Sequence, residues 1–367
     1  MPSKKVLCIL LLGVLLINLS PFASSVQQQS MLPSSFSWTD IEGVDYTTPI
    51  KNQAPAPTCE AYALCAALET LMQYQTGELF APDLSETHLY FYAGGTYDQG
   101  GVNVRDAAEY LVEYGVPDEG CYPDPHRPFD YEYESVEDWP NRTVKITDWG
   151  YVPHEDEAIK QALMDYGPLT ICIFVYADMY DYNGGIYRRS TDEIVGGHLV
   201  SLMGFDDEQE YWLVKNSWGD SWGEDGWFLM GYDMEMFIDG CYGGDSGIIY
   251  VDGVYGNFEP EVPKINIISP VIYKNYLFNL AFPQLIRQIE GLQTAAPRII
   301  GAFTLDIQAE NTQIIEVVVD GNPFETLTES PFEQKMRLSR GLHTIELFAY
   351  DSEGRESRDI VDVFVVL

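Results

Sequence analysis

The stretch that decides the fold is KNQAPAPTCEAYALCAALE, residues 51–69, in which a proline-rich turn leads directly into a helical pattern. Thr58 is a suitable N-cap, alanine, leucine and glutamate favour the interior, and Gly77 is suited to end a helix, so we expect a helix between these two residues. Cys59 then lies in the first turn. There the free backbone N–H groups and the positive end of the helix dipole favour a thiolate, the reactive form of cysteine.

A cysteine nucleophile needs a base, a group that orients the base, and donors for the oxyanion. His198 begins the apolar, strand-like run HLVSLMGF, and Asn216 ends the next such run, YWLVKN. Two adjacent strands joined by a short hairpin would bring His198 beside Asn216. The Asn216 amide would then accept from one imidazole nitrogen and leave the other facing Cys59. The sequence therefore contains a candidate Cys-His-Asn site.

The motifs KNQ…TCEAYA, GGHLVSLMGF and YWLVKNSWGDSWGEDGWF together resemble the papain family of cysteine peptidases, over about residues 36–256. The resemblance implies an α+β domain of two lobes, a mainly helical half and a β-barrel-like half, with the active cleft between them. It implies an enzyme, a cysteine-type endopeptidase that cleaves peptide or protein substrates through a thioester acyl-enzyme, with neither a metal nor a cofactor. Its catalytic positions fall on Cys59, His198, Asn216 and Gln53.

The resemblance also gives roles to further residues. Gln53 falls on the glutamine of the oxyanion hole, and Trp218 would shield the His-Asn hydrogen bond from water. Gly100 and Gly101 fall where the family binds the substrate backbone, and without side chains they allow an extended peptide to approach closely. In addition, Cys172 and Leu199 would line the pocket that selects the residue two before the cut.

Two departures from the family pattern lie near the nucleophile. Ala56 replaces a cysteine that usually staples the turn by a disulfide, and Glu60 replaces a tryptophan. A carboxylate beside Cys59 would raise the thiol pKa, but it would also favour the charged imidazolium of His198. Glu60 therefore keeps an alternative open, in which the chain is a weakly active or inactive papain-like binding or adhesion protein.

The composition of the sequence changes around residues 256–270, GNFEPEVPKINIISP, where acidic residues and prolines become frequent. Such a stretch is a candidate domain boundary. The β-rich runs beyond it are separated by turn signals such as Asp320 and Gly321, which is typical of an all-β sandwich. These runs resemble immunoglobulin-like modules of secreted prokaryotic proteins. We expect a papain-like domain at residues 26–258 and an immunoglobulin-like domain at residues 259–367, the second binding a cell surface or a polymer.

The first residues have the pattern of a signal peptide: Lys4 and Lys5, an apolar run over residues 6–19, and small residues at 23–25. The run is short for a membrane span. We expect residues 1–25 to be removed, leaving a secreted or cell-surface protein without a membrane span; an uncleaved anchor is the alternative. The chain has 57 acidic and 20 basic side chains, a net charge of -37, which disfavours nucleic acid as a partner.

Cysteine spacing gives no indication of a metal site. The cysteines that follow the expected signal peptide lack the C-x-x-C or histidine-rich spacing of zinc ligands. Their number is odd, which indicates at least one free thiol in an exported protein and leaves the pairing of the others open. These cysteines are Cys59, Cys65, Cys121, Cys172 and Cys241.

Overall fold

The computed structural model describes residues 32–96, 100–123, 135–233, 247–256, 263–271, 274–277, 279–283, 296–352 and 354–366. The expected signal peptide at residues 1–25 and Cys241 lie outside these ranges. Within them, no helix is long and apolar enough to cross a membrane. The buried apolar side chains form two clusters, one between residues 38 and 254 and the other between residues 265 and 365. The domain limits at residue 258 and residue 259 stay a prediction.

The central helix of the first cluster starts at the cysteine expected in its first turn. α1 runs from Cys59 to Thr76 and is buried on every face as far as Gln73. Gly77 ends it in the left-handed conformation with φ 69°. Thr58 has φ -110° and ψ 25° rather than the extended backbone of a capping residue, so the expected Thr58 side-chain cap is wrong. The other helices are α2 (Glu86–Tyr92), α3 (Val104–Glu113), α4 (Asp156–Asp165), η1 (Glu119–Cys121), η2 (Trp139–Asn141) and η3 (Ala177–Asp181).

One large sheet accompanies these helices, with the strand order β3-β9-β4-β6-β7-β8-β5 and β1 beside β6. A separate pair is formed by β2 and β10. The antiparallel pairing of β6 with β7 confirms the hairpin expected from the two apolar runs. The strands are β1 (Ser35–Ser37), β2 (Val144–Lys145), β3 (Asp148–Tyr151), β4 (Leu169–Tyr176), β5 (Ile186–Tyr187), β6 (Ile194–Asp206), β7 (Tyr211–Lys215), β8 (Trp227–Gly231), β9 (Ile248–Asp252) and β10 (Tyr255–Gly256).

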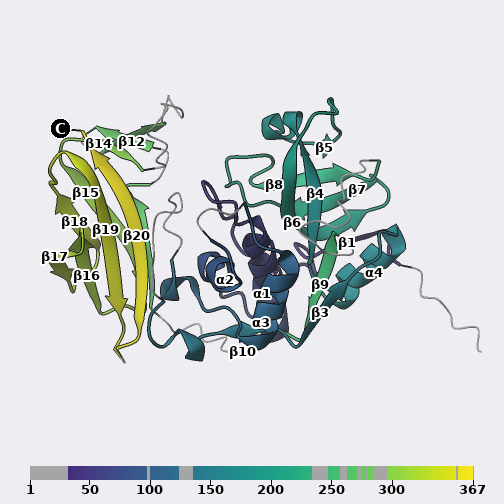
Figure 1. Cartoon of the computed structure of the whole chain (residues 1–367), viewed down its shortest axis with the longest axis horizontal. Helices are drawn as coiled ribbons and strands as arrows, with labels where there is room; N and C mark the ends of the chain where they lie inside the picture. Colours follow the sequence, from purple (N-terminus) through teal and green to yellow (C-terminus); the bar gives the residue numbers. More distant parts are fainter. Residues whose placement is uncertain are drawn as a thin grey trace, which may run out of the picture. The chain divides into compact units, whose positions relative to one another are not determined.

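Helix α1 meets the sheet at β6, so the two elements that carry the candidate nucleophile and base are in direct contact. The Ser201 hydroxyl of β6 donates to the Ala63 carbonyl of α1 at 3.0 Å. Figure 1 shows α1, α2 and α3 gathered together, with β4, β6, β7 and β8 forming the neighbouring layer. The mixed helical and stranded architecture agrees with the expected α+β class.

The second cluster is built from strands, with a three-stranded sheet β11-β15-β18 and a seven-stranded sheet β13-β12-β14-β20-β19-β16-β17. Alternate residues of β15, β19 and β20 point into one shared core, as period-two patterning predicts. Asp320 and Gly321, with φ 51° and 72°, make the expected tight turn between β16 and β17. β14 pairs in parallel with β12 and β20.

These strands are β11 (Lys264–Ser269), β12 (Lys274–Leu277), β13 (Leu280–Pro283), β14 (Arg298–Ile300), β15 (Phe303–Glu310), β16 (Ile314–Val319), β17 (Asn322–Leu327), β18 (Phe332–Met336), β19 (Gly341–Tyr350) and β20 (Glu356–Val365). The all-β character of this region supports the expectation of a β-sandwich. Its assignment to the immunoglobulin-like class stays a prediction.

Candidate active site

The structure brings His198 and Asn216 of the expected Cys-His-Asn site into contact, and it places Cys59 against the residue that follows His198. Cys59 is the first residue of α1, His198 lies in β6, and Asn216 directly follows β7. His198 Nε2 lies 2.8 Å from Asn216 Oδ1. The backbone N–H of Leu199, the residue after His198, hydrogen-bonds to the Cys59 thiol. Because Nε2 is engaged by Asn216, this contact leaves the other imidazole nitrogen, Nδ1, unused.

Aromatic rings cover the His198-Asn216 hydrogen bond. Trp218 stacks on the His198 ring with a centroid distance of 4.8 Å and an interplanar angle of 23°. Tyr180 stacks in turn on Trp218 at 5.3 Å, and Trp222 meets Trp218 edge-on at 4.9 Å. His198 and Asn216 are 4% and 3% exposed, so the pair is held in a dry environment.

Gln53 is fixed beside the same strand end by both its backbone and its side chain. Its backbone N–H donates to Ser217 O at 2.9 Å, and its Oε1 accepts from the Ser217 hydroxyl at 2.6 Å. Its Nε2 donates one hydrogen to Ala56 O at 3.0 Å. An amide nitrogen carries two hydrogens, so Gln53 retains the capacity to donate to an oxyanion.

The expected substrate-backbone loop lies next to Glu60, the residue after Cys59. Glu60 is fully buried; its Oε1 accepts from the Val102 N–H at 2.9 Å, and its Oε2 lies 3.7 Å from the Cys59 sulfur. Gly101 has φ 115°, a conformation that favours glycine. A Cβ added to Gly100 would meet no atom within 4 Å, so this edge of the loop faces open space.

The other two residues expected to contact substrate lie inside the sheet. Cys172 of β4 pairs directly with Leu199 of β6, and the two are 0% and 1% exposed. Cys172 is disulfide-bonded. Their assignment to a specificity pocket stays a prediction, and in this structure neither presents a side chain to solvent. Within the described residues, the free thiols are Cys59, Cys65 and Cys121.

Burial shifts the pKa values of Cys59 and His198. It raises the Cys59 pKa well above its usual value, and the negative charge of Glu60 raises it further. Burial also lowers the His198 pKa to about 4, although the hydrogen bond with Asn216 opposes this shift. Loss of water therefore disfavours both the thiolate of Cys59 and the imidazolium of His198, and on Cys59 it acts against the helix N-terminus.

Comparison with known proteins gives this arrangement its family. The model of the papain family cysteine proteases matches residues 32–243, more than half of the chain. The chain belongs to the papain family of cysteine proteases.

Curated papain-family relatives share about three tenths of their aligned residues with this chain. Digestive cysteine proteinase 1 of Homarus americanus is 32% identical over 210 residues, which cover 53% of this chain and 63% of the relative. Procathepsin L of Felis catus is 30% identical over 215 residues, 56% of this chain and 62% of the relative. Testin-2 of Mus musculus is 31% identical over 209 residues, which cover 53% of this chain and 60% of the relative. The chain thus spans about three fifths of the length of these relatives.

A solved structure shows the same fold. Xylellain, a cysteine protease from Xylella fastidiosa, superposes with a TM-score of 0.51 and 22% identity, over 61% of this chain and 87% of xylellain. This likeness concerns the fold of the papain-family domain. It agrees with the expected two-part architecture of helices and sheet.

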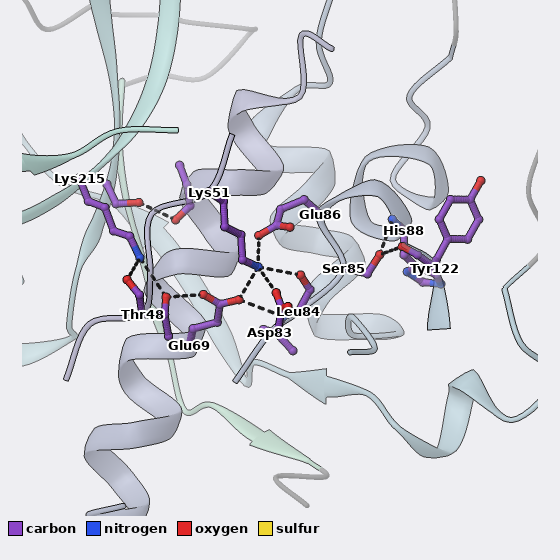
Figure 2. Close-up of polar contacts among 12 residues, drawn as sticks. Thr48, Lys51, Glu69, Asp83, Leu84, Ser85, Glu86, His88, Tyr122 and Lys215 are labelled. Carbon is purple, nitrogen blue, oxygen red and sulfur yellow. Dashed lines mark hydrogen bonds and ion pairs between the residues drawn. The ribbon is translucent and has the colours of Figure 1, made fainter. Parts of the chain in front are cut away.

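A partly buried ion cluster in the papain-family domain was not predicted from the sequence (Figure 2). The Lys51 ammonium lies 2.8 Å from Glu69, 2.6 Å from Asp83 and 2.7 Å from Glu86. Although burial lowers the Lys51 pKa, these carboxylates raise it well above its usual value. Burial raises the Glu86 pKa to about 8, against the effect of Lys51. The carboxylates thus surround an ammonium group, and among the described residues no cluster is arranged to hold a metal ion.

The cluster continues to the strand that precedes Asn216. Lys215 Nζ donates to the carbonyl of Thr48 at 2.7 Å and to its hydroxyl at 2.9 Å, and that hydroxyl donates to Glu69 at 2.6 Å. Burial lowers the Lys215 pKa to about 8. The signal in the sequence is a charge inside an apolar run: Lys215 ends YWLVK, and Glu69 interrupts an apolar helix.

Proposed function

We propose that the protein is an exported cysteine-type endopeptidase that hydrolyses peptide bonds at Cys59, with His198, Asn216 and Gln53 as its other catalytic residues. The observation that carries the proposal is the 2.8 Å contact between His198 Nε2 and Asn216 Oδ1, made beside a cysteine that begins a buried helix. In this geometry one ring nitrogen is held and the other is available to the thiol. Membership of a cysteine protease family supports the same chemistry.

In the proposed reaction the Cys59 thiol transfers its proton to His198 Nδ1 as sulfur attacks the substrate carbonyl carbon. The C=O π electrons move to oxygen, and the resulting oxyanion accepts from the Cys59 backbone N–H and from the second Nε2 hydrogen of Gln53. Collapse of this intermediate breaks the C–N bond. His198 gives the proton to the leaving amine, and a thioester to Cys59 remains.

Hydrolysis of the thioester uses the same groups in reverse. A water molecule passes a proton to His198 as its oxygen attacks the thioester carbon, and the thiol regains a proton when the acid leaves. Asn216 keeps the imidazole oriented through both steps, and Trp218 keeps water from their hydrogen bond. Gly100 and Gly101 would hold the substrate backbone, with the side chain two before the cut directed towards Cys172 and Leu199.

The experiment is covalent labelling combined with peptide cleavage. The wild-type chain and Cys59→Ala are incubated with an epoxide-type thiol-protease inhibitor, adducts are mapped by mass spectrometry, and both proteins are assayed on a broad peptide library. Cys65→Ala is the matched control, since Cys65 is a buried free thiol of the same helix. We expect an adduct at Cys59 and cleavage that only Cys59→Ala abolishes. Absence of both from the wild-type chain would overturn the endopeptidase.

A second candidate is favoured by one observation, the buried Glu60 carboxylate 3.7 Å from the sulfur. Its charge opposes a thiolate, so the domain would be a weakly active or inactive papain-like protein that serves in binding or adhesion. The same experiment separates the two candidates, because a protein that binds peptides without forming an adduct or cleaving them belongs to the second class.

For the whole chain we propose secretion or attachment to the cell surface. The lysine pair and short apolar run before residue 25 support export. We further propose that residues 259–367 form an immunoglobulin-like domain that positions the peptidase on a cell surface or polymer. Sedimentation of the full-length Cys59→Ala chain with isolated cell envelopes tests this role, and a chain that stays wholly in the supernatant overturns it.

A further inference from the structure

Glu60 is the most unusual buried charge near the proposed site. It follows the nucleophile directly and is 0% exposed. A buried carboxylate is costly unless donors satisfy it, and this one has two partners from different elements. Oε1 accepts from the Val102 N–H at 2.9 Å, and Oε2 lies 3.7 Å from the Cys59 sulfur.

We propose that Glu60 is a positioning residue of the peptidase, which holds the loop at residues 100–102 against α1 and sets by its charge the pH range in which the Cys59 thiol reacts. The proposal rests on the proposed function and adds a regulatory group to the same site. Its two parts, a clamp and a charge, have separate readouts.

The clamp follows from the position of Val102. This residue comes directly after Gly100 and Gly101, so its hydrogen bond to Glu60 fixes the open edge of the loop relative to the sulfur. A displacement of about 1 Å between nucleophile and substrate costs roughly a hundredfold in rate. Glutamine at position 60 would keep an acceptor for the Val102 N–H, whereas alanine would remove it.

The charge acts through the groups that surround the carboxylate. The thiol of Cys59 belongs to the same helix. Among the described residues, Tyr90 of α2 is a further titratable neighbour, and burial and the Glu60 charge raise its pKa to about 12. Leu199 of β6, the residue after His198, directs its backbone N–H towards the Cys59 sulfur. The groups that lower the Glu60 pKa are its own backbone N–H, the Val102 N–H and the Cys59 thiol.

The direction of the pH effect follows from these neighbours. Burial raises the Glu60 pKa to about 7. Above that pH the ionised carboxylate opposes formation of the thiolate, and below it the neutral acid does not. Glu60→Gln imitates the neutral acid at every pH, so it should accelerate the thiol only where wild-type Glu60 is ionised.

The charge is tested by the alkylation rate of Cys59 with iodoacetamide, from pH 5 to 9, in the full-length chain. We expect Glu60→Gln to react at least about tenfold faster than the wild type at pH 8, the effect of one pKa unit, and within about twofold at pH 5.5. The matched control is Glu78→Gln, an exposed glutamate just after α1. A rate ratio that does not change with pH would overturn the charge role.

The clamp is tested by hydrogen exchange of the Val102 amide in the same proteins. We expect the Val102 amide to be at least about tenfold less protected in Glu60→Ala than in Glu60→Gln. Equal protection in the two variants would overturn the clamp. Should Glu60→Ala fail to fold, Glu60→Leu replaces it in this comparison. Neither readout needs peptide cleavage. A chain that shows both effects but cleaves no peptide overturns the endopeptidase and keeps the inference about Glu60.

Discussion

Lys51 Nζ lies 2.8 Å from Glu69 Oε1 and so ties the loop before the candidate oxyanion donor to the middle of α1. The other oxygen of Glu69 accepts from Thr48, whose hydroxyl accepts in turn from Lys215. The buried Glu69 carboxylate therefore connects the segments that carry Cys59, Gln53 and Asn216, three of the four proposed catalytic residues (Figure 2). We expect the cluster to contribute mainly to the free energy of unfolding, because its positive and negative side chains compensate one another.

Replacing Lys51 by methionine tests the cluster. Glu69 and Glu86 would be left buried without their cation, and removal of one partner from a buried ion cluster costs about 3–5 kcal/mol. We expect Lys51→Met to lose about that much free energy of unfolding, measured by urea denaturation. Arg105→Met is the control, because the Arg105 ion pairs are 3.5 and 3.6 Å long and exposed, and should contribute less than about 1 kcal/mol. Equal losses of unfolding free energy in Lys51→Met and Arg105→Met would contradict the stabilising role of the cluster.

Replacing Asn216 by alanine tests the orientation of the proposed base. The substitution removes the acceptor 2.8 Å from His198 Nε2, so the imidazole loses its fixed position. We expect kcat/KM on a cleaved peptide to fall roughly tenfold to a hundredfold, since positioned acid–base catalysis contributes about that much or more. The control is Asn103→Ala, which removes the side-chain cap of α3. A similar fall in this variant would mean that the effect comes from lost stability.

The sequence predicted those local features of the candidate site that follow from neighbouring residues and from the order of strands. Cys59 could be placed at a helix start from its flanking residues, and the β6–β7 hairpin followed from two apolar runs. The contact between Glu60 and Val102 was beyond the same reasoning, because it joins residues 42 positions apart through a backbone N–H. The effect of burial on the Cys59 pKa was missed for a related reason, since the helix dipole is local whereas burial depends on the whole fold.

His88 gives a pH-dependent prediction of stability. It is 0% exposed, stacks on Tyr92 at 4.0 Å and meets the Trp139 ring at a tilt, 4.6 Å away. Both of its ring nitrogens lack a hydrogen-bond partner among the described residues. Burial lowers its pKa to about 3. The folded state therefore binds fewer protons than the unfolded state between about pH 6.5 and pH 3, and this group reduces the free energy of unfolding as the pH falls.

We expect His88→Phe to remove that loss. Relative to the wild type, the variant should gain about 1.4 kcal/mol per pH unit as the pH falls from 6 to 4, measured by urea denaturation at each pH. His343 is a control of opposite sign. Burial lowers its pKa, but the hydrogen bond with Asp320 outweighs this effect, so the His343 pKa is raised. His343→Phe should therefore lose stability at low pH relative to the wild type. A difference that does not vary with pH in His88→Phe would contradict the buried neutral state.

Trp218 gives a prediction about the proposed base itself. Burial lowers the His198 pKa to about 4, and the Trp218 ring, stacked at 4.8 Å, supplies part of that burial. Trp218→Ala would admit water to the imidazole and weaken the penalty on its charged form, so the His198 pKa should rise towards its usual value of about 6.5. The measurement is an NMR titration of isotope-labelled histidine in the Cys59→Ala background, which excludes alkylation and self-cleavage.

At pH 5 the two proteins should then differ in charge: His198 stays mainly neutral with Trp218 in place and becomes mainly protonated without it. Trp149→Ala is the matched control, because Trp149 is a half-buried tryptophan of β3 whose ring packs on Tyr151. The His198 pKa should not change in that variant. An unchanged pKa in Trp218→Ala would mean that the backbone around β6, rather than the aromatic cover, keeps the imidazole dry, and the shielding role of Trp218 would have to be abandoned.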